Sequence, residues 1–95
     1  MKRVYKYEVP FEDEFSLNLP KGAQILSFQS QVSASGLQEL PVIWVLVDPS
    51  LKQEETRFFR MAGTGHPIEG DFGAFIGTAQ FLGARLTFHL FERPR

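Results

Sequence analysis

The sequence predicts an all-β fold, a small sandwich or open barrel of about seven mostly antiparallel strands joined by hairpins. Short stretches in which apolar and polar residues alternate recur along the chain, as in half-buried strands. The breaks between them contain turn residues such as Pro and Gly, and no stretch shows the apolar period of a helix. A chain of 95 residues is expected to fold as a single all-β domain over residues 1–95.

Three strands are expected in the first third of the chain, over residues 3–9, 15–19 and 23–32. In the first, Tyr5 and Tyr7 alternate with Lys6 and Glu8, which is typical of a half-exposed strand. The Leu-Pro-Lys-Gly stretch at 19–22 predicts a tight turn, because Pro fixes φ and Gly tolerates a positive φ. The third strand places Gln29 on a polar face. That face is either solvated or a binding surface, and we include Gln29 in a candidate site.

Residues 41–47 are continuously apolar and rich in β-branched side chains, which predicts a central strand covered on both faces. A small sandwich can cover both faces of a strand only if a further layer, or another subunit, lies outside. The chain also has more large aromatic residues than one small core needs, so we predict a homo-oligomer. The aromatic residues in question are Tyr5, Tyr7, Trp44 and Phe91.

Residues 56–62 are expected to return beside 41–47 as a second hairpin. Arg57 and Arg60 both lie next to aromatic residues, which suits stacking of a guanidinium on a ring. These arginines either snorkel at the rim of a sheet or clamp an anion or a planar ligand. Strand parity puts them on opposite faces, so both can serve one flat site only if the strand has a bulge.

The last hairpin is expected over 75–81 and 84–91, with Leu82-Gly83 as a two-residue turn. In that register Gly77 lies opposite Phe88, whose ring covers the bare glycine. The other face of the hairpin is polar, with the expected pairs Ile76–His89, Thr78–Thr87 and Gln80–Arg85. We interpret His89 as a surface residue, and we include Thr78 and Gln80 among the candidate ligand contacts.

A long loop over 63–74 separates the strand of Arg57 from the last hairpin. Connections of this length in a compact domain are more often functional or disordered than idle. Gly63 and Gly65 allow unusual backbone conformations, and free N–H groups beside Thr64 could form a nest for an anion. His66 is either part of a rigid turn, capping a backbone group, or a ligand contact or acid–base residue. The string lacks the Gly-x4-Gly-Lys-Ser/Thr pattern of a phosphate-binding P-loop.

Composition excludes several other classes. The formal net charge is −1 and the basic residues form no stripe, so no nucleic acid polymer is expected as a partner. No secretion signal is present, and the longest apolar run, Val42–Val47, is too short to span a membrane, so we predict a cytoplasmic protein without a membrane partner. There is no Cys and there are two His, so no metal site and no cofactor are predicted.

Several strings together resemble a family of small uncharacterised phage and bacterial proteins, a domain of unknown function. The resemblance covers nearly the whole chain and implies a compact all-β fold and a phage or prophage origin, with the host cytoplasm as the location. It implies no activity and no catalytic residue. The strings are Tyr5-Lys6-Tyr7, Leu19-Pro20-Lys21-Gly22-Ala23, Trp44-Val45-Leu46-Val47-Asp48-Pro49, Gly63-Thr64-Gly65-His66-Pro67-Ile68, Ile76-Gly77-Thr78 and Phe88-His89-Leu90-Phe91-Glu92.

These observations support three hypotheses of function. The preferred one is a non-catalytic binding protein for a small phosphorylated or nucleotide-like ligand, such as a host nucleotide signal. Its candidate contacts are Gln29, Arg57, Arg60, Gly63, Thr64, Gly65, His66, Thr78 and Gln80. The alternative is a structural or protein-interaction subunit, of a virion or of a complex with a host protein, with no small ligand. An enzyme ranks third, with His66 as general base oriented by Asp71 or Glu69.

Overall fold

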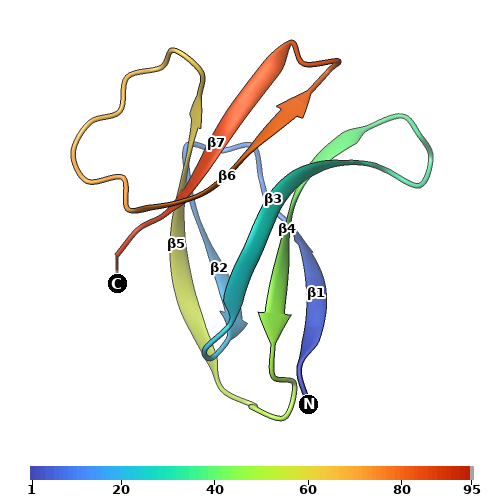
Figure 1. Ribbon diagram of the computed structural model, residues 1–95, viewed down its shortest axis with the longest axis vertical. Coiled ribbons are helices and arrows are strands. Elements are labelled where there is room, and N and C mark those ends of the chain that lie inside the picture. Colours follow the sequence, from blue (N-terminus) through green and yellow to red (C-terminus); the bar gives the residue numbers. More distant parts are fainter. Residues whose placement is uncertain (95) are drawn as a thin grey trace.

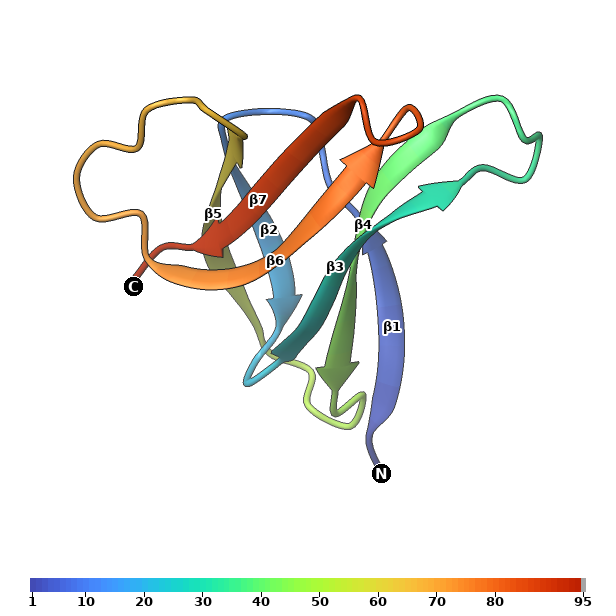
Figure 2. The same ribbon diagram turned by 45° about the horizontal axis from the view of Figure 1, so that its top comes forward.

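The computed structural model describes residues 1–94, which form seven β-strands in two sheets and no helix (Figure 1). The strands are β1 (Arg3–Glu8), β2 (Glu14–Pro20), β3 (Gln24–Val32), β4 (Glu39–Val47), β5 (Glu54–Gly63), β6 (Ala74–Phe81) and β7 (Leu86–Glu92). One sheet has the order β1-β4-β3 and the other β2-β5-β7-β6, and all the pairings are antiparallel. The predicted all-β fold is confirmed as an open sandwich, since the two sheets do not close into a barrel (Figure 2).

The connections between strands follow from the need to bury two apolar faces against each other. Hairpins join β3 to β4 and β6 to β7, while the chain crosses between the sheets after β1, β2 and β4. The expected hairpin between 41–47 and 56–62 is therefore wrong, because β4 and β5 belong to different sheets. Ile43 of β4 and Phe59 of β5 meet face to face in the core, where neither is accessible to more than a trace of solvent. Strands whose apolar sides must face each other become opposite layers rather than neighbours.

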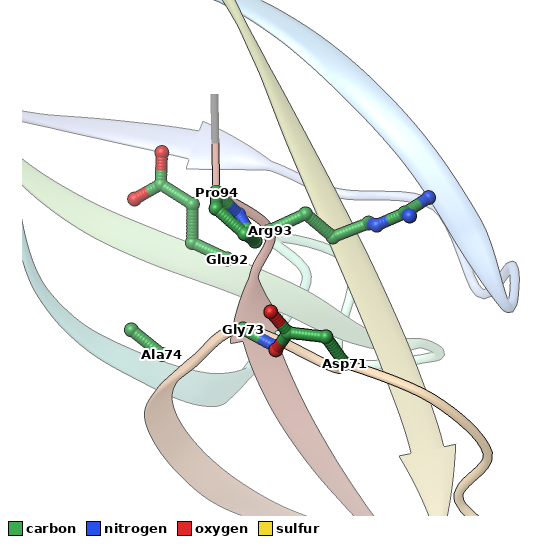
Figure 3. A pocket seen from close by; sticks show the side chains of 6 residues that line it. All are labelled: Asp71, Gly73, Ala74, Glu92, Arg93 and Pro94. Carbon is green, nitrogen blue, oxygen red and sulfur yellow. The ribbon is translucent and has the colours of Figure 1, made fainter.

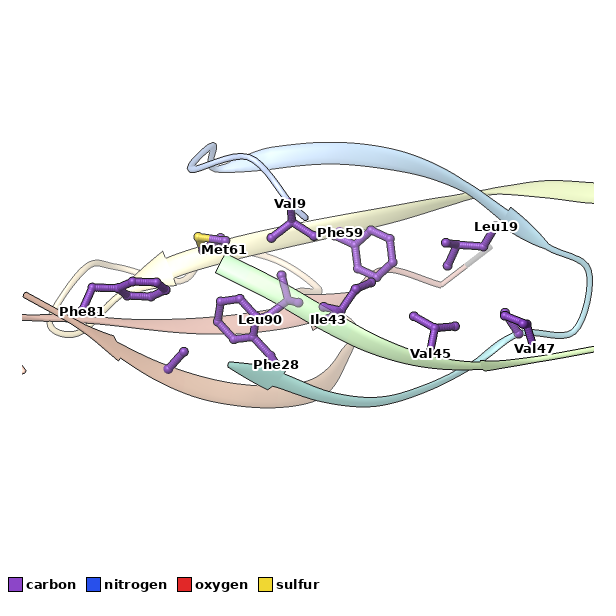
Figure 4. Packing of buried hydrophobic residues seen from close by; sticks show 12 residues of the cluster. Val9, Leu19, Phe28, Ile43, Val45, Val47, Phe59, Met61, Phe81 and Leu90 are labelled. Atoms are coloured by element: carbon purple, nitrogen blue, oxygen red, sulfur yellow. The ribbon is translucent and has the colours of Figure 1, made fainter. Parts of the chain in front are cut away.

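The core lies between the two sheets and draws on nearly every strand (Figure 4). Its largest fully buried side chains are Phe59, Phe81, Leu19, Ile43 and Leu90. Phe15 stacks on Phe59 with ring centroids 5.3 Å apart, which closes the core beside β2. At the opposite side β3 and β6 cross closely: a Cβ on Gly77 would lie 3.3 Å from the Cβ of Phe28. The glycine lets the two sheets approach each other there.

On the outer face of β4, Val42 is covered without a third layer of structure. Ile43 and Val45 point into the core, so Val42 and Trp44 face outward. Val42 is nevertheless fully buried. Lys6 Nζ donates to Gln31 Oε1 at 2.7 Å across β4, so long side chains of β1 and β3 help to cover this position. The expected cover on both faces is thus supplied for Val42 by neighbouring strands of the same sheet.

The register of the last hairpin differs from the predicted one. Its turn is centred on Gly83 and Ala84, which both have positive φ (63° and 70°), and Arg85 N donates to Leu82 O at 3.2 Å. The expected turn at Leu82-Gly83 is therefore wrong by one residue. Cross-strand partners move by two from Phe81 to Gly77 and by one at Phe75, beyond the bulge, so Gly77 faces Leu90 instead of Phe88. A shift by two leaves the same side chains on the inner face, and Phe81, now paired with Leu86, lies in the core.

Candidate functional site

The loop between β5 and β6 is tied to the fold at both ends. Residues 64–73 leave the end of β5, swing away from the sandwich and return to the start of β6 (Figure 1). At the first end Thr64 N donates to Thr87 O at 3.1 Å. At the second end the Phe72 ring meets Phe91 edge-on, with centroids 5.2 Å apart, and Gly73 N donates to Asp71 Oδ1 at 2.8 Å. The loop is therefore held in one place beside the four-stranded sheet.

The Gly-Thr-Gly-His stretch forms a β-turn in which each residue has a defined role. His66 N donates to Gly63 O at 3.1 Å, and Gly65 has a φ of +86° at the third position, as in a type II turn. Gly63 provides space, because a Cβ there would lie 2.9 Å from Cε1 and Nδ1 of His66. The imidazole therefore packs against bare backbone. The rigid turn that the sequence suggested as one alternative is present, and it fixes where the His66 ring lies.

A second histidine links this turn to the sheet. Thr64 Oγ1 lies 2.8 Å from Nε2 of His89, and Thr78 Oγ1 lies 2.9 Å from Nδ1 of the same ring. Each threonine hydroxyl can donate or accept, so the pair satisfies either neutral tautomer of His89. The shifted register makes this possible, because it pairs Thr78 directly with His89. His89 was predicted to be a surface residue beside Thr and Arg on the polar face of the hairpin, whereas it is half-buried and bonds to both threonines.

One pocket beside the loop has a lining suited to an anion. Its volume is about 320 Å³, and it lies between the turn and the first residues of β7. Its polar lining residues are Thr64, Thr87, His66 and Arg85, and no Asp or Glu of the described residues lines it. Arg85 and Thr87 were not among the predicted contacts, although the expected register paired them with Gln80 and Thr78, which were. They line the pocket because the turn at 63–66 lies beside the start of β7.

His66 also lines a neighbouring pocket of about 290 Å³, together with Arg60, Phe72, Pro67 and Asp13. The guanidinium of Arg60 lies over the Phe72 ring, 4.0 Å from its centroid. Arg60 Nε is 3.3 Å from Glu14 Oε1, yet this buried nitrogen has no hydrogen bond of acceptable geometry. Arg60 is thus oriented by an aromatic ring and a carboxylate without being saturated by them. Phe72 lies in the loop, and its only sequence signal was its place in a long connection.

Arg57 lies elsewhere, between the two sheets. It is 6% exposed, and it donates through Nη2 to Glu92 Oε1 at 2.8 Å and through Nη1 to the carbonyl oxygen of Ala23. The hydrogen bond with Glu92 raises the pKa of Arg57, against the opposing effect of burial. Arg57 and Arg60 therefore point to opposite faces of β5, as strand parity predicted. The saturated guanidinium of Arg57 is a part of the fold rather than an open ligand contact.

The predicted contact residues fall into three places. Gln29 lies on the outer face of the three-stranded sheet, where its Oε1 accepts from Trp44 Nε1 at 2.8 Å, and Arg57 lies inside the sandwich. Gln80 pairs with Thr87 at the edge of the anion-suited pocket. The structure brings together the residues of the turn and of the outer face of the four-stranded sheet, namely Arg60, Gly63, Thr64, Gly65, His66, Thr78 and Gln80.

Another pocket, of about 480 Å³, lies where the loop meets the end of β7 (Figure 3). Its carboxylates already have partners, since Asp71 accepts from Gly73 N and Glu92 binds Arg57. Gly73 crosses the β7 backbone so closely that a Cβ would lie 2.0 Å from Glu92 O. We interpret this pocket as the junction at which the end of the loop, residues 71–73, is fixed against the end of β7.

Residues 1–94 contain no group of three His, Cys, Asp or Glu residues placed to hold a metal ion. The Asp71 carboxylate that was considered as a partner for His66 is bonded to Gly73 N instead. In the same part of the chain there is no helix long and apolar enough to cross a membrane.

The comparisons with known proteins identify a family but no activity. A family model described as a domain of unknown function (DUF7352) matches residues 1–95, and the chain belongs to that family. No curated protein and no solved structure matches the chain. The family assignment agrees with the resemblance noted in the sequence as far as an uncharacterised domain, and the function has to be argued from the site.

Proposed function

We propose that the protein is a non-catalytic binding protein that holds a small phosphorylated or nucleotide-like ligand at the Gly63–Ile68 loop. The observation that carries the proposal is the lining of the anion-suited pocket. His66, Arg85, Thr64 and Thr87 line this pocket, and no Asp or Glu of the described residues does. The Thr64 hydroxyl also bonds to Nε2 of His89. Hydroxyl and guanidinium donors are the groups that bind phosphate oxygens in proteins.

The neighbouring pocket supplies a place for the planar part of such a ligand. The guanidinium of Arg60 already lies over the Phe72 ring, 4.0 Å from its centroid, and a purine or pyrimidine ring can stack on the other side of the guanidinium. His66 lines both pockets, so one molecule can reach from one to the other past the imidazole. Asp13 in the second pocket disfavours a phosphate there, which orients the ligand with its phosphate toward Arg85.

The resemblance to phage proteins supports one biological role for such binding. A small protein that binds a nucleotide and does not transform it serves to sequester a host signal in the cytoplasm of an infected cell. The proposed sequestering role rests on the resemblance to phage proteins and on the pocket lining, and identification of the bound ligand tests it.

The test is a thermal-shift and calorimetric screen of the purified protein. The probes are inorganic phosphate, nucleoside monophosphates, cyclic dinucleotides and unphosphorylated nucleosides. A ligand at a hundred times its Kd adds about 2.7 kcal/mol to the free energy of unfolding. For a domain of this size that raises Tm by roughly 10–20 °C. We expect a phosphorylated nucleotide to give such a shift, and the matching nucleoside to give a much smaller one.

Two variants and a control assign the effect to the loop. Arg85→Gln and Gly63→Ala should each weaken binding at least roughly tenfold, the second because the new methyl group displaces the His66 ring. Lys52→Gln removes one exposed charge outside the two pockets and should bind like wild type. The proposal fails if no phosphorylated compound shifts Tm, or if Lys52→Gln weakens binding as much as Arg85→Gln does.

A structural or protein-interaction subunit without a small ligand remains the second candidate. The observation in its favour is the outer face of the three-stranded sheet, where Val4, 53% exposed, lies beside Leu46 and near the half-buried Trp44. Exposed apolar side chains grouped on a sheet face are typical of association surfaces. On this account Gly63→Ala changes stability or assembly and no nucleotide binds. The predicted homo-oligomer is compatible with either function.

A further inference from the structure

Four strands lie at the edges of the two sheets, and three of them carry features that block pairing with another strand. β3 has a bulge between Ile25 and Ser27 and β6 has one between Phe75 and Gly77, and these two strands also pack against each other. β2 ends in Pro20. Bulges, proline and cover by other elements are the devices by which proteins prevent their sheets from adding strands.

β1 has no bulge, no proline and no cover by another element; of the devices that protect edge strands it has only charged side chains, such as Lys6. It is a straight run of six residues without Pro or Gly, and its outer edge borders solvent in both overall views (Figures 1 and 2). Val9 N donates to Pro41 O at 3.0 Å, which fixes the alternation of the ladder: odd-numbered residues of β1 bond to β4. The backbone N–H and C=O groups of Val4, Lys6 and Glu8 therefore point to the open edge.

We propose that β1 pairs antiparallel with β1 of a second copy of the chain, with Tyr5 facing its own counterpart at a two-fold axis. In such a pair, residue i meets residue j and j meets i. Facing residues must lie on the same side of the sheet, so both numbers are even or both are odd. The Val4, Lys6 and Glu8 backbone groups then bond between the two copies.

Charge disfavours the registers centred on Val4 and on Lys6, and Pro10 disfavours the one centred on Tyr7, in which Val4 would face a residue without an N–H. A pairing centred on Lys6 sets two lysine side chains directly opposite each other, and a pairing centred on Val4 sets Lys2 opposite Lys6. Like charges in facing positions destabilise a sheet. The pairing centred on Tyr5 places Lys2 opposite Glu8, twice by symmetry.

The same register suits the remaining side chains of β1. Arg3 faces Tyr7, an arrangement that permits a cation–π contact, and Val4 faces the aliphatic stem of Lys6. Tyr5, which is 40% exposed in the single chain, meets its counterpart at the non-hydrogen-bonded position, where facing side chains lie closest. The product is a continuous six-stranded sheet, β3-β4-β1-β1-β4-β3, with the exposed apolar Val4 at its centre.

The first test is charge reversal, read by sedimentation velocity across a range of protein concentrations. The wild-type chain should sediment as a dimer. Glu8→Lys sets lysines against Lys2 and should weaken dimerisation at least roughly tenfold, since two such pairs are lost at once. The double variant Lys2→Glu/Glu8→Lys restores opposite charges and should recover the dimer. Glu12→Lys, the same change outside β1, is the control and should dimerise like wild type.

The second test determines the register by disulfide cross-linking. The chain has no native cysteine, so only the introduced cysteine can form a disulfide. At the two-fold axis the Cα atoms of facing residues lie about 4.5 Å apart, within reach of a disulfide. Tyr5→Cys should therefore oxidise rapidly to a covalent dimer. Val4→Cys and Lys6→Cys, which mark the two rejected registers, should react far more slowly.

A wild-type chain that sediments as a monomer at all concentrations overturns the proposal, as does a dimer that Glu8→Lys leaves intact. Faster cross-linking through Val4→Cys or Lys6→Cys overturns the register. The outcome is independent of the nucleotide screen, because β1 contributes no residue to either pocket beside the loop.

Discussion

Arg57 and Arg60 lie three residues apart on β5, and the structure gives them opposite roles. Arg57 is enclosed between the sheets and bonded to Glu92 and to a backbone carbonyl. Arg60 lies on the outer face over Phe72, near an exposed Glu14, with an unsatisfied Nε. An arginine in the interior must have all its partners within the fold, whereas an arginine on a face can keep donors for a ligand. Burial and the number of hydrogen-bond partners, rather than residue type, therefore distinguish a structural arginine from one that is open to a ligand.

The largest expected effect comes from breaking each ion pair in turn at its carboxylate. Glu92→Gln leaves the Arg57 charge buried with a weaker partner and should lower the free energy of unfolding by about 3–5 kcal/mol. Glu14→Gln removes an exposed partner of Arg60 and should cost about 0–1 kcal/mol. Urea unfolding of both variants measures the difference. Equal losses would mean that the two arginines do not divide between fold and site as described.

An intermediate effect is expected in the loop, where two glycines share a positive φ but differ in surroundings. Gly70 has a φ of +71° and open space around it, whereas Gly73, with a φ of +89°, crosses the backbone of Glu92. Both Gly→Ala changes carry backbone strain of about 1–3 kcal/mol. Gly73→Ala should cost a further 1–3 kcal/mol or so, because the β7 backbone must move. Equal Tm values for the two variants would contradict the close contact between Gly73 and the β7 backbone.

Much of the fold could be predicted from the sequence, because local alternation determines strands and their faces. The seven strands, the lack of a helix and the opposite faces of Arg57 and Arg60 all followed from periods of two. That β4 and β5 lie in different sheets could not be predicted, since a hairpin and a face-to-face arrangement bury the same residues. The hairpin turn was misplaced by one residue because Leu82 and Ala84 give no strong turn signal, and both have positive φ.

The candidate site was predicted only in its central part. The Gly63–His66 turn was recognisable from its own residues. Arg85 and His89 reach it because the turn lies beside β7, a contact between distant segments that residue periodicity does not show. Gln29 had the right chemistry but lies on the other sheet, which no local pattern reveals.

The smallest expected effect concerns an exposed carboxylate that serves only a turn. The pKa of Asp48 is lowered because its side chain accepts hydrogen bonds from the Ser50 hydroxyl and from Ser50 N. A lowered pKa in the folded state stabilises the protein above the unfolded-state value of about 3.9, and this contribution is lost as pH falls through the folded-state pKa. The Tm difference between wild type and Asp48→Asn should thus be constant near neutral pH and shrink below about pH 4. A difference that grows with acidity would contradict the assignment.

The measurement that tests the central claim most directly is an amide NMR titration of the intact protein with the nucleotide that gives the largest thermal shift. If the Gly63–Ile68 loop holds the phosphate, the amide signals of Thr64, Gly65, Arg85 and Thr87 should move together along one saturable curve. Those of Ser27 and Gln29, on the outer face of the other sheet, should stay in place. Unmoved loop signals, or shifts confined to the three-stranded sheet, would contradict the account and favour a protein-interaction subunit.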